Sequence, residues 1–423
     1  MDSLQTPVQQ SAKTQSTTIQ SMPAQPALTA KKSVVIAGSG FGGLRVAEKL
    51  RKNCGEAIEI VVIDSADCHT FVPALYSVAT GETSAQAVCE PLSVIYIRKG
   101  IKYIQEKIVD IDVKKKIVST KKDKRLNKNN KAANTIPYDF LVLALGSEVN
   151  FYDIKGIQKN AFALKTKENA AAIYEHLQDV ITSMANKDKQ LHRLVILGGG
   201  VTGVELACEL KDHLDNVCRQ NSIPREKFSV MIIQALEHLV PGFPANVQKF
   251  CEHYMAEHGI ELRLNSPVVQ AKNQLLVLKS GEIIKADTVI WAGGIKANKL
   301  LNKIKIEQDD YGIKVNSYLQ SVSDQNIYAV GDCMNYSDQK TGKRALKTAQ
   351  NALMQAVIVA ENINRAANEK NIFKSYKPKE TPVLISLGKK MGLFVWKSFW
   401  FRGYWMMKMK DYIEKEYMWK IRL

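Results

Sequence analysis

Residues 33–52 read SVVIAGSGFGGLRVAEKLRK, and this stretch decides the fold. Its apolar start predicts a buried strand, its glycine cluster predicts a tight turn, and its final residues predict an amphipathic helix. The next apolar segment, EIVVIDS at 59–65, predicts a second strand. Such a turn lets the backbone approach a pyrophosphate, which then lies on the free N–H groups that begin the helix. We therefore expect a Rossmann-like fold whose dinucleotide is held by Gly38, Gly40, Phe41, Gly42, Gly43 and Asp64.

A second copy of this pattern starts 160 residues further along the chain. The segment LVILGGGVTGVELACELKDHL (194–214) repeats the strand, the turn and the helix, and FSVMIIQ (228–234) repeats the following strand. An internal duplication of one nucleotide-binding fold explains both copies. Two such folds in one α/β chain predict a tightly bound flavin and an exchanging nicotinamide. The second loop is expected to bind its nucleotide through Gly198, Gly200 and Gly203.

The second copy differs from the first at the end of its second strand, where Gln234 replaces an acid. A carboxylate at this position would bind the 2′-hydroxyl of NADH and repel the additional phosphate of NADPH. The neutral amide removes that repulsion, so we expect Gln234 to contribute to nucleotide binding and to permit NADPH. The alternative is that Glu237, or another acid of the loop, replaces the missing carboxylate.

A third motif, NIYAVGDC at 326–333, predicts a short strand that ends at Gly331 and Asp332. The helical run TAQNALMQAVIVAENI follows at 348–363. In flavoproteins with two dinucleotide folds such a strand returns to the first domain, and its Asp bonds the ribityl chain of the flavin. This arrangement assigns FAD to the first fold and NADH or NADPH to the second. The alternative is a capping Asp in an ordinary loop.

The segment DSADCHTFVPALYSVATGE at 64–82 resembles the D-x-x-x-x-H-x-F-x-P-x-L-Y-x-V-A-x-G signature of type II NADH:quinone oxidoreductases. Blocks at 138–157, 286–298 and 326–333 are similar to other blocks of that family and follow in the same order. The resemblance covers residues 31 to about 365 and is looser beyond them. It implies FAD in the first domain, NAD(P)H in the second, and two-step reduction of a membrane quinone without proton pumping.

The resemblance also implies roles for individual residues. Gly146 is expected to contact FAD, and Glu205 to lie near the nicotinamide as a catalytic residue, although an acid that interacts with the helix dipole is the alternative. Ala349 and Gln350 match the A-Q pair that lines the quinone entrance beneath the flavin, which makes Gln350 the second candidate catalytic residue.

Two features of these blocks leave alternatives open. The family repeats Gln four positions after the first, whereas this chain has Met354 there, followed by Gln355, which faces another direction on a helix. The contact to the quinone head group on that side is therefore open. His69 and Tyr76 of the signature are expected either to reach the flavin cavity or to serve packing.

The expected reaction passes a hydride from NAD(P)H to N5 of FAD and then two electrons to a membrane quinone, as in a respiratory chain. An alternative is an NAD(P)H-dependent quinone reductase similar to the ferroptosis-suppressor group, with a lipid-protective role. A sulfide:quinone oxidoreductase is disfavoured because residues 90–207 and 334–423 contain no cysteine. A flavin-bearing membrane-binding protein without catalytic activity is the alternative of another class.

Composition excludes several other classes. The chain has 423 residues, a formal charge of +17 and no run of 18 apolar residues, so a spanning helix is not expected. Its seven cysteines lack C-x-x-C spacing, which disfavours a secreted disulfide scaffold, a zinc ribbon and a dithiol redox centre. The histidines show no ligand spacing, so we expect no metal site. The basic stretch at 121–131 has no interleaved aromatics, which favours a solvated hairpin loop over nucleic-acid binding.

The C-terminal segment differs from the rest of the chain. Residues 373–423 contain 12 Lys and Arg against 4 Asp and Glu, and they hold four of the five tryptophans. Trp and Tyr favour the headgroup boundary of a bilayer, and basic residues attract anionic lipid. We therefore expect residues 393–423 to form a helix or helical hairpin that lies on the bilayer surface. The alternatives are a terminal helix packed on the body or a homodimer contact.

These patterns together predict the organisation of the chain. Residues 1–30, rich in Gln, Ser, Thr, Pro and Ala, are expected to be a disordered tail without the features of a secretory signal. The expected domains are an FAD domain at 31–155 and 315–370, an NAD(P)H domain at 156–314, and a membrane-interface segment at 371–423. We expect a peripheral protein on the cytoplasmic face of a bacterial inner membrane, or on the mitochondrial inner membrane of a eukaryote.

Overall fold

The structure is a computed structural model that describes residues 1–3, 31–121, 134–185, 191–339 and 342–423. Residues 32–423 form one compact unit. The predicted tail, from residue 4 onward, and the predicted basic loop, from residue 122 onward, lie outside the described residues.

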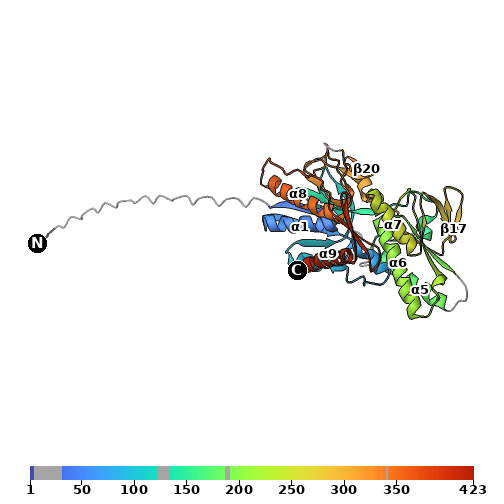
Figure 1. Cartoon of the computed structure of the whole chain (residues 1–423). Helices are drawn as coiled ribbons and strands as arrows, with labels where there is room; N and C mark the ends of the chain where they lie inside the picture. The colour runs from blue at the N-terminus through green and yellow to red at the C-terminus, as the bar shows by residue number, and fades with distance from the viewer. Residues whose placement is uncertain (4–30, 122–133, 186–190, 340–341) are drawn as a thin grey trace. The chain divides into compact units, whose positions relative to one another are not determined.

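Five parallel strands form the first sheet, in the order β22-β9-β1-β2-β5. Its central strands are runs of Val, Ile and Leu because both faces of a parallel sheet are covered. Helix α1 follows β1 and packs beside α8, which lies next to it in Figure 1. The bounds are β22 Ile327–Ala329, β9 Phe140–Leu143, β1 Lys32–Ala37, β2 Ile58–Asp64, β5 Lys102–Gln105, α1 Phe41–Cys54 and α8 Ala349–Ala367.

The second sheet repeats this plan in the order β11-β18-β12-β13-β14, again with parallel pairs throughout. Strand β12 pairs with β13 over six residues in register, as β1 pairs with β2. The predicted α/β fold with two Rossmann-like units is therefore confirmed. The bounds are β11 Phe162–Ala163, β18 Thr288–Trp291, β12 His192–Leu197, β13 Phe228–Ile233, β14 Ile260–Arg263, α5 Lys167–Ala185, α6 Val201–Gln220 and α7 Ala245–Glu257.

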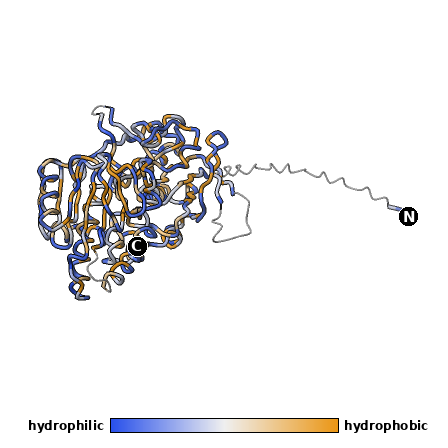
Figure 2. Tube along the Cα trace, turned by 90° about the vertical axis from the view of Figure 1, so that its right-hand side faces the viewer, coloured by the Kyte–Doolittle hydropathy of each residue, from blue (hydrophilic) through white to orange (hydrophobic). Residues whose placement is uncertain are grey.

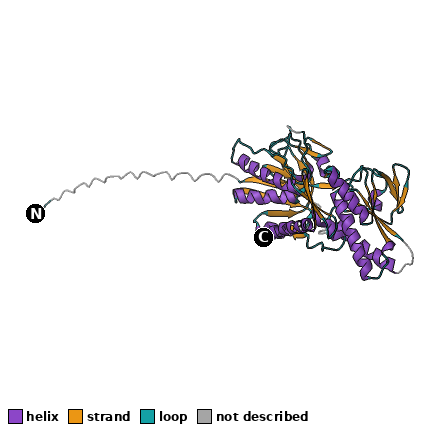
Figure 3. Cartoon of the chain, viewed as in Figure 1, coloured by secondary structure: helices purple, strands orange, loops and turns teal. Residues whose placement is uncertain are grey.

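Helices lie against both sheets (Figure 3), and hydrophobic residues gather along the strands inside the body (Figure 2). Strand β22 pairs with β9 although it comes much later in the sequence, so the chain returns to the first sheet after building the second. The residue limits of the predicted domains stay a prediction.

Smaller elements complete the compact unit. They are β3 Cys68–Thr70, α2 Leu75–Ala79, β4 Cys89–Pro91, α3 Leu92–Arg98, β6 Lys107–Asp112, β7 Ile117–Lys121, β8 Asn134–Pro137, β10 Ser147–Val149, α4 Ile157–Asn160, β15 Val268–Lys272, β16 Leu275–Leu278, β17 Ile283–Lys285, β19 Ile295–Ala297, β20 Gln308–Asp309, β21 Gly312–Lys314 and β23 Met334–Asn335.

The C-terminal segment departs from the expected helix or helical hairpin. Strands β24 (Val383–Ser386), β25 (Gly392–Trp396) and β26 (Phe399–Gly403) form an antiparallel sheet, and helix α9 (Tyr404–Arg422) follows. The expectation is wrong for the hairpin because LFVW and FWFR suit paired strands, with β-branched and aromatic residues. Helix α9 packs on the body through Lys410, Met418 and Ile421. No helix within the described ranges is both long and apolar enough to span a bilayer.

Cys68 and Cys89 form a disulfide between β3 and β4, which the spacing of the cysteines did not indicate. The other five cysteines are free. The bonded cysteines lie 21 positions apart in the sequence, and the pairing of β3 with β4 brings them together without a C-x-x-C motif. The lack of C-x-x-C spacing therefore does not exclude a bond between cysteines that are distant in sequence, and the expected absence of a dithiol redox centre stays a prediction.

Candidate active site

The first glycine turn is closed on its inner side and open in front of Gly40. Gly38 has a φ of +102°, and a Cβ atom there would overlap the carbonyl oxygen of Ala144. A Cβ on Gly43 would overlap the carbonyl oxygen of Gly38, so both positions exclude a side chain. At Gly40 no other group lies within 4 Å of the place a Cβ would occupy. The open space therefore lies where a pyrophosphate approaches the loop.

The N-terminus of α1 faces this space without a competing anion. No side chain caps the helix, and its first turn contains no acid, so its first N–H groups and its dipole can bind a phosphate. Asp64 at the end of β2 accepts hydrogen bonds from the N–H groups of Ser39 (2.6 Å) and Ala66 (2.9 Å). Burial raises the pKa of Asp64, and these bonds oppose that shift. The residues present fit the pyrophosphate and ribose of FAD.

The second turn has the same construction. Gly198 has a φ of +117° and faces the carbonyl of Ala292, and Gly203 faces the carbonyl of Gly198. The space in front of Gly200 is open, and α6 also begins without a side-chain cap or an acid in its first turn. Gln234 takes the position of Asp64, since its Oε1 accepts a hydrogen bond from Gly199 N–H at 3.2 Å. This loop fits a second dinucleotide.

Gly331 and Asp332 follow β22 at the carboxyl end of the parallel strands, which is the end of the sheet that also carries the first glycine turn. Asp332 accepts a hydrogen bond from Ser147 Oγ at 2.7 Å, and Lys165 Nζ donates to the same hydroxyl at 2.8 Å. Burial lowers the pKa of Lys165, while Asp332 opposes this shift. Lys165 lies in the loop before α5 and belongs to no recognisable motif, so the sequence did not indicate its role. Gly146, with a φ of +65°, lies just before Ser147 and has open space beside it.

Helix α8 carries two glutamines, of which one is exposed and the other is buried. Thr348 caps the helix by accepting a hydrogen bond from Asn351 N–H, and Ala349 is the first helical residue. Gln350 is exposed, with its Nε2 3.4 Å from the carbonyl oxygen of Pro382. Gln355 is buried and accepts a hydrogen bond from Gly331 N–H at 2.8 Å. Gln355 therefore faces the Gly331 turn.

Glu205 lies in a buried cluster between α6, β24 and α9. Its Oε1 accepts a hydrogen bond from Ser386 N–H at 3.0 Å and lies 3.3 Å from Lys410 Nζ. Burial raises the pKa of Glu205, and Lys410 opposes this shift. Lys410 also donates to Tyr76 Oη (2.9 Å) and to Glu414 (2.7 Å). Burial would lower the pKa of Lys410, but the acids around it raise it well above the ordinary value. Glu205 therefore contacts Ser386 and Lys410, and an interaction with the helix dipole alone does not account for these contacts.

The signature residues join the first glycine turn to α9. His69 places Nδ1 3.1 Å from the carbonyl oxygen of Ser39 and Nε2 2.9 Å from the hydroxyl of Tyr417. Burial lowers the pKa of His69, which favours the neutral ring. Phe41 and Phe71 pack against Tyr417, with ring centroids 5.2 Å apart in each case. His69 and Tyr76 thus both bind residues of the C-terminal helix, contacts that the sequence did not reveal.

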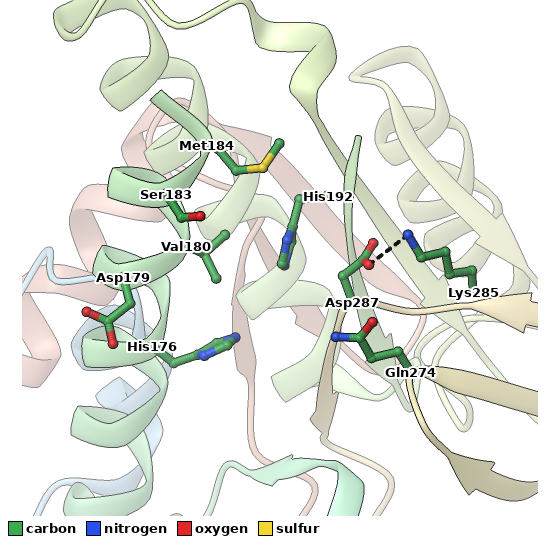
Figure 4. Close-up of a pocket in the computed structure, with 9 residues that line it drawn as sticks. All are labelled: His176, Asp179, Val180, Ser183, Met184, His192, Gln274, Lys285 and Asp287. Carbon is green, nitrogen blue, oxygen red and sulfur yellow. Dashed lines mark ion pairs between the residues drawn. The ribbon is translucent and has the colours of Figure 1, made fainter. Parts of the chain in front are cut away.

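A cavity of about 320 Å³ is lined by residues of α5 and by His192, Gln274, Lys285 and Asp287 (Figure 4). His176 and His192 each place Nε2 2.8 Å from Thr288 Oγ1, and Lys285 pairs with Asp287 at 3.1 Å. His192 begins β12, whose opposite end precedes Gly198, about 20 Å away for a strand of this length. The cavity is therefore distant from the second glycine turn.

Comparison with known proteins identifies the class to which this fold and these two loops belong. The model of the pyridine nucleotide-disulphide oxidoreductase family matches residues 32–356, and the chain belongs to this family of oxidoreductases. The resemblance seen in the motifs is confirmed by relatives that carry the same name. A type II NADH:quinone oxidoreductase of Staphylococcus aureus (strain bovine RF122 / ET3-1) is 26% identical over 354 residues, covering 80% of this chain and 83% of the relative.

Solved structures share the fold. NDH2 from Plasmodium falciparum, in complex with NADH, superposes with a TM-score of 0.81 at 19% identity, over 93% of this chain and 97% of the other. The sulfide:quinone oxidoreductase of Aquifex aeolicus superposes with a TM-score of 0.78 at 22% identity, over 92% of this chain and 91% of the other. Because both sequence identities are below 25%, these two likenesses establish the architecture alone.

Glu209, one helical turn after Glu205, provides a pH-dependent test of this region. Burial, with Glu82 nearby, raises the pKa of Glu209 from 4.5 to about 7. Between these values the folded chain binds more protons at Glu209 than the unfolded chain does, so the free energy of unfolding falls as pH rises through this window. We expect Glu209→Gln to remove up to about 3 kcal/mol of that fall, measured by denaturant unfolding from pH 4.5 to 7.5. Glu175→Gln, on the exposed face of α5, is the control, and equal slopes in both variants would contradict the prediction.

Proposed function

We propose that the chain is an FAD-dependent NAD(P)H:quinone oxidoreductase of the type II class. The observation that carries this proposal is the pair of glycine turns, each with an open space in front of its third loop position and an uncapped helix behind it. FAD is bound tightly at the first turn and NADH or NADPH exchanges at the second. When bound, FAD supplies two-electron transfer between the nicotinamide and a quinone.

The protein contributes binding, orientation and charge to this reaction. The first N–H groups of α1 and α6 hold the two pyrophosphates, and Asp64 holds the adenosine ribose of FAD. Asp332 holds the ribityl chain, with Lys165 as a nearby positive charge 4.0 Å from its carboxylate. Glu205, paired with Lys410 at 3.3 Å, lies toward the nicotinamide. Ala349 and Gln350 line the approach of the quinone.

The function is tested by turnover with purified full-length protein. The proposal expects a yellow protein that oxidises NADH and reduces a short-chain ubiquinone analogue in equal molar amounts. A flavin-containing protein that turns over neither substrate would instead be a membrane-binding protein without catalysis. A protein that consumes sulfide but not NADH would contradict the proposal.

The nucleotide preference depends on Gln234, which is buried at the end of β13. Its amide nitrogen donates to the carbonyl oxygen of His238 at 3.2 Å, so the whole amide is fixed against the loop. Because no negative charge stands at this position, we expect kcat/KM for NADPH to lie within a hundredfold of that for NADH. Gln234→Glu should lower kcat/KM for NADPH about tenfold relative to NADH through charge repulsion.

Glu237, the alternative acid, is exposed and supplies the matched control. If Gln234 sets the preference, Glu237→Gln leaves the ratio of the two kcat/KM values unchanged. A rise in NADPH use in Glu237→Gln, with no change in Gln234→Glu, would assign the role to Glu237. A preference for NADH above a hundredfold in the natural chain would refute tolerance of NADPH.

The membrane surface is proposed to be the outer face of the β25–β26 hairpin together with α9. Phe399, Phe401 and Trp405 are 66%, 62% and 76% exposed there, and Trp419 is also exposed. Beside the hairpin, α7 and β26 line a groove that carries basic side chains, with the Arg402 guanidinium 4.6 Å from the centre of the Phe250 ring. Aromatic and basic groups in one region match a headgroup boundary with anionic lipid. We propose that this surface binds the cytoplasmic face of the inner membrane in a bacterial host, or the mitochondrial inner membrane in a eukaryotic host.

Deletion of residues 393–423 is a poor test, because α9 covers Glu205 and His69. We instead expect the triple variant Phe399→Ser, Phe401→Ser, Trp405→Ser to weaken binding to anionic vesicles at least about tenfold, since each exposed ring loses apolar burial. Vesicle co-sedimentation measures this change. The control replaces three exposed apolar residues elsewhere with Ser, namely Ile97, Leu236 and Ile283. Equal binding by the two triple variants would refute the assigned surface.

A further inference from the structure

The disulfide between Cys68 and Cys89 lies beside a charged side chain that the dinucleotide sites do not use. Lys167 Nζ, at the start of α5, is 3.2 Å from Cys68 Sγ and 3.7 Å from Cys89 Sγ. Asp67 holds the same ammonium group at 2.7 Å, and Glu168 lies 3.8 Å from it. Both sulfurs therefore lie close to the ammonium group of Lys167, and the ion pair with Asp67 holds that group in position.

The two cysteines differ in solvent exposure. Cys68 is buried, with 6% of its surface exposed, whereas Cys89 is only partly buried. An attacking thiolate reaches the more accessible sulfur first, and the other sulfur then leaves. Cys68 is the leaving group in this geometry, and it is also the sulfur nearer to Lys167. An adjacent ammonium stabilises a thiolate and so favours this direction of cleavage.

The bond also lies at a junction of the fold. Strands β3 and β4 carry His69 and Glu90 in opposite positions. His69 contacts the first glycine turn and Tyr417, and Glu90 accepts a hydrogen bond from Arg422 at 3.2 Å. The two strands thus connect the proposed FAD loop with the C-terminal helix. The disulfide between the two strands therefore fixes the position of His69 relative to that of Glu90.

We propose that Cys68–Cys89 is a reversible thiol-exchange site for low-molecular-weight thiols, with Lys167 stabilising the Cys68 thiolate. A thiolate RS⁻ attacks Cys89 Sγ, the bond between the two cysteines breaks, and a Cys89–S–S–R bond forms while Cys68 leaves as a thiolate. A second thiol then attacks the mixed disulfide and releases R–S–S–R. Two thiols are oxidised by two electrons in all, the protein disulfide gains those electrons, and the two thiol protons pass to the cysteines or to solvent.

The experiment equilibrates the full-length flavoprotein in glutathione buffers of graded ratio, quenches it with acid, alkylates free thiols, and counts them by mass spectrometry. The count should change reversibly from five to seven as the buffer becomes more reducing. Rapid quenching should trap glutathione on Cys89. Five thiols at every ratio, with reduction only after unfolding in urea, would show a structural cross-link and overturn the proposal. Glutathione trapped on Cys68 instead would overturn the assigned leaving group.

Charge variants test the role of Lys167 with opposite signs. Lys167→Met should shift the equilibrium about tenfold toward the disulfide, and Asp67→Asn should shift it toward the dithiol, because they remove a cation and an anion beside the thiolate. Lys167→Arg should restore the natural equilibrium, and the exposed Lys159→Met on α4 is the control. An unchanged equilibrium in Lys167→Met, or shifts of the same sign in both charge variants, would contradict the proposal.

Discussion

Gly40→Leu is expected to yield a folded chain that no longer retains flavin. The backbone at Gly40 has φ −70° and ψ −166°, which any residue adopts, and no other group lies within 4 Å of the place its Cβ would occupy. The leucine side chain therefore strains nothing and fills only the space in front of the helix. Loss of two hydrogen bonds to a charged pyrophosphate costs about 3 kcal/mol or more, so flavin affinity should fall at least about a hundredfold.

Gly200→Leu is the matched variant at the second turn. Its backbone, with φ −71° and ψ 178°, is equally permissive, and its surroundings are equally open. We expect this variant to keep its flavin and to lose NADH binding by a similar factor. Flavin content after gel filtration and NADH affinity by calorimetry measure both effects. Flavin loss in Gly200→Leu but not in Gly40→Leu would reverse the assignment of the two loops.

The second large effect is expected from Lys410→Met, which removes the cation of the buried cluster. Lys410 lies between Glu205, Glu414 and Tyr76, and 7% of its surface is exposed. Methionine leaves Glu205 buried without its charged partner. Breaking a buried ion pair in this way costs about 3–5 kcal/mol of unfolding free energy. Denaturant unfolding followed by tryptophan fluorescence measures the loss.

Two further variants separate the ion pair from general damage to α9. Lys408→Met removes an exposed lysine of the same helix, 3.9 Å from Asp411, and should change stability by less than about 1 kcal/mol. Adding Glu205→Leu to Lys410→Met should recover much of the lost stability, because no unpaired charge then remains buried. If the double variant is less stable than Lys410→Met, the loss does not come from the unpaired carboxylate.

The glycine turns, their strands and their helices could be predicted from sequence because their signals are local. A run such as VVIA before Gly38 must be buried, and the helix after it follows from apolar spacing over about fourteen residues. The same local signals marked Asp64 and Gln234 as equivalent positions, and the structure bonds both to the N–H of the residue after the first loop glycine.

The contacts of the C-terminal segment could not be predicted because their partners are distant in sequence. Lys410 pairs with Glu205, and Tyr417 binds His69, across separations that no spacing rule reports. The disulfide was missed for the same reason, because only the pairing of β3 with β4 brings its cysteines together. Residues 393–403 lie mainly in strands rather than in the expected helix or helical hairpin, because aromatic and basic residues at mixed spacing carry no clear period that distinguishes the two.

The central claim is that one chain holds a flavin at its first loop and lets a nicotinamide bound at its second loop reduce it. Anaerobic titration of the purified full-length protein with NADH, followed by flavin absorbance, tests this claim most directly. The account predicts complete bleaching at one NADH per flavin and full return of colour on addition of one equivalent of a quinone analogue. A protein purified without flavin, or a bound flavin that stays oxidised in excess NADH and NADPH, would contradict it.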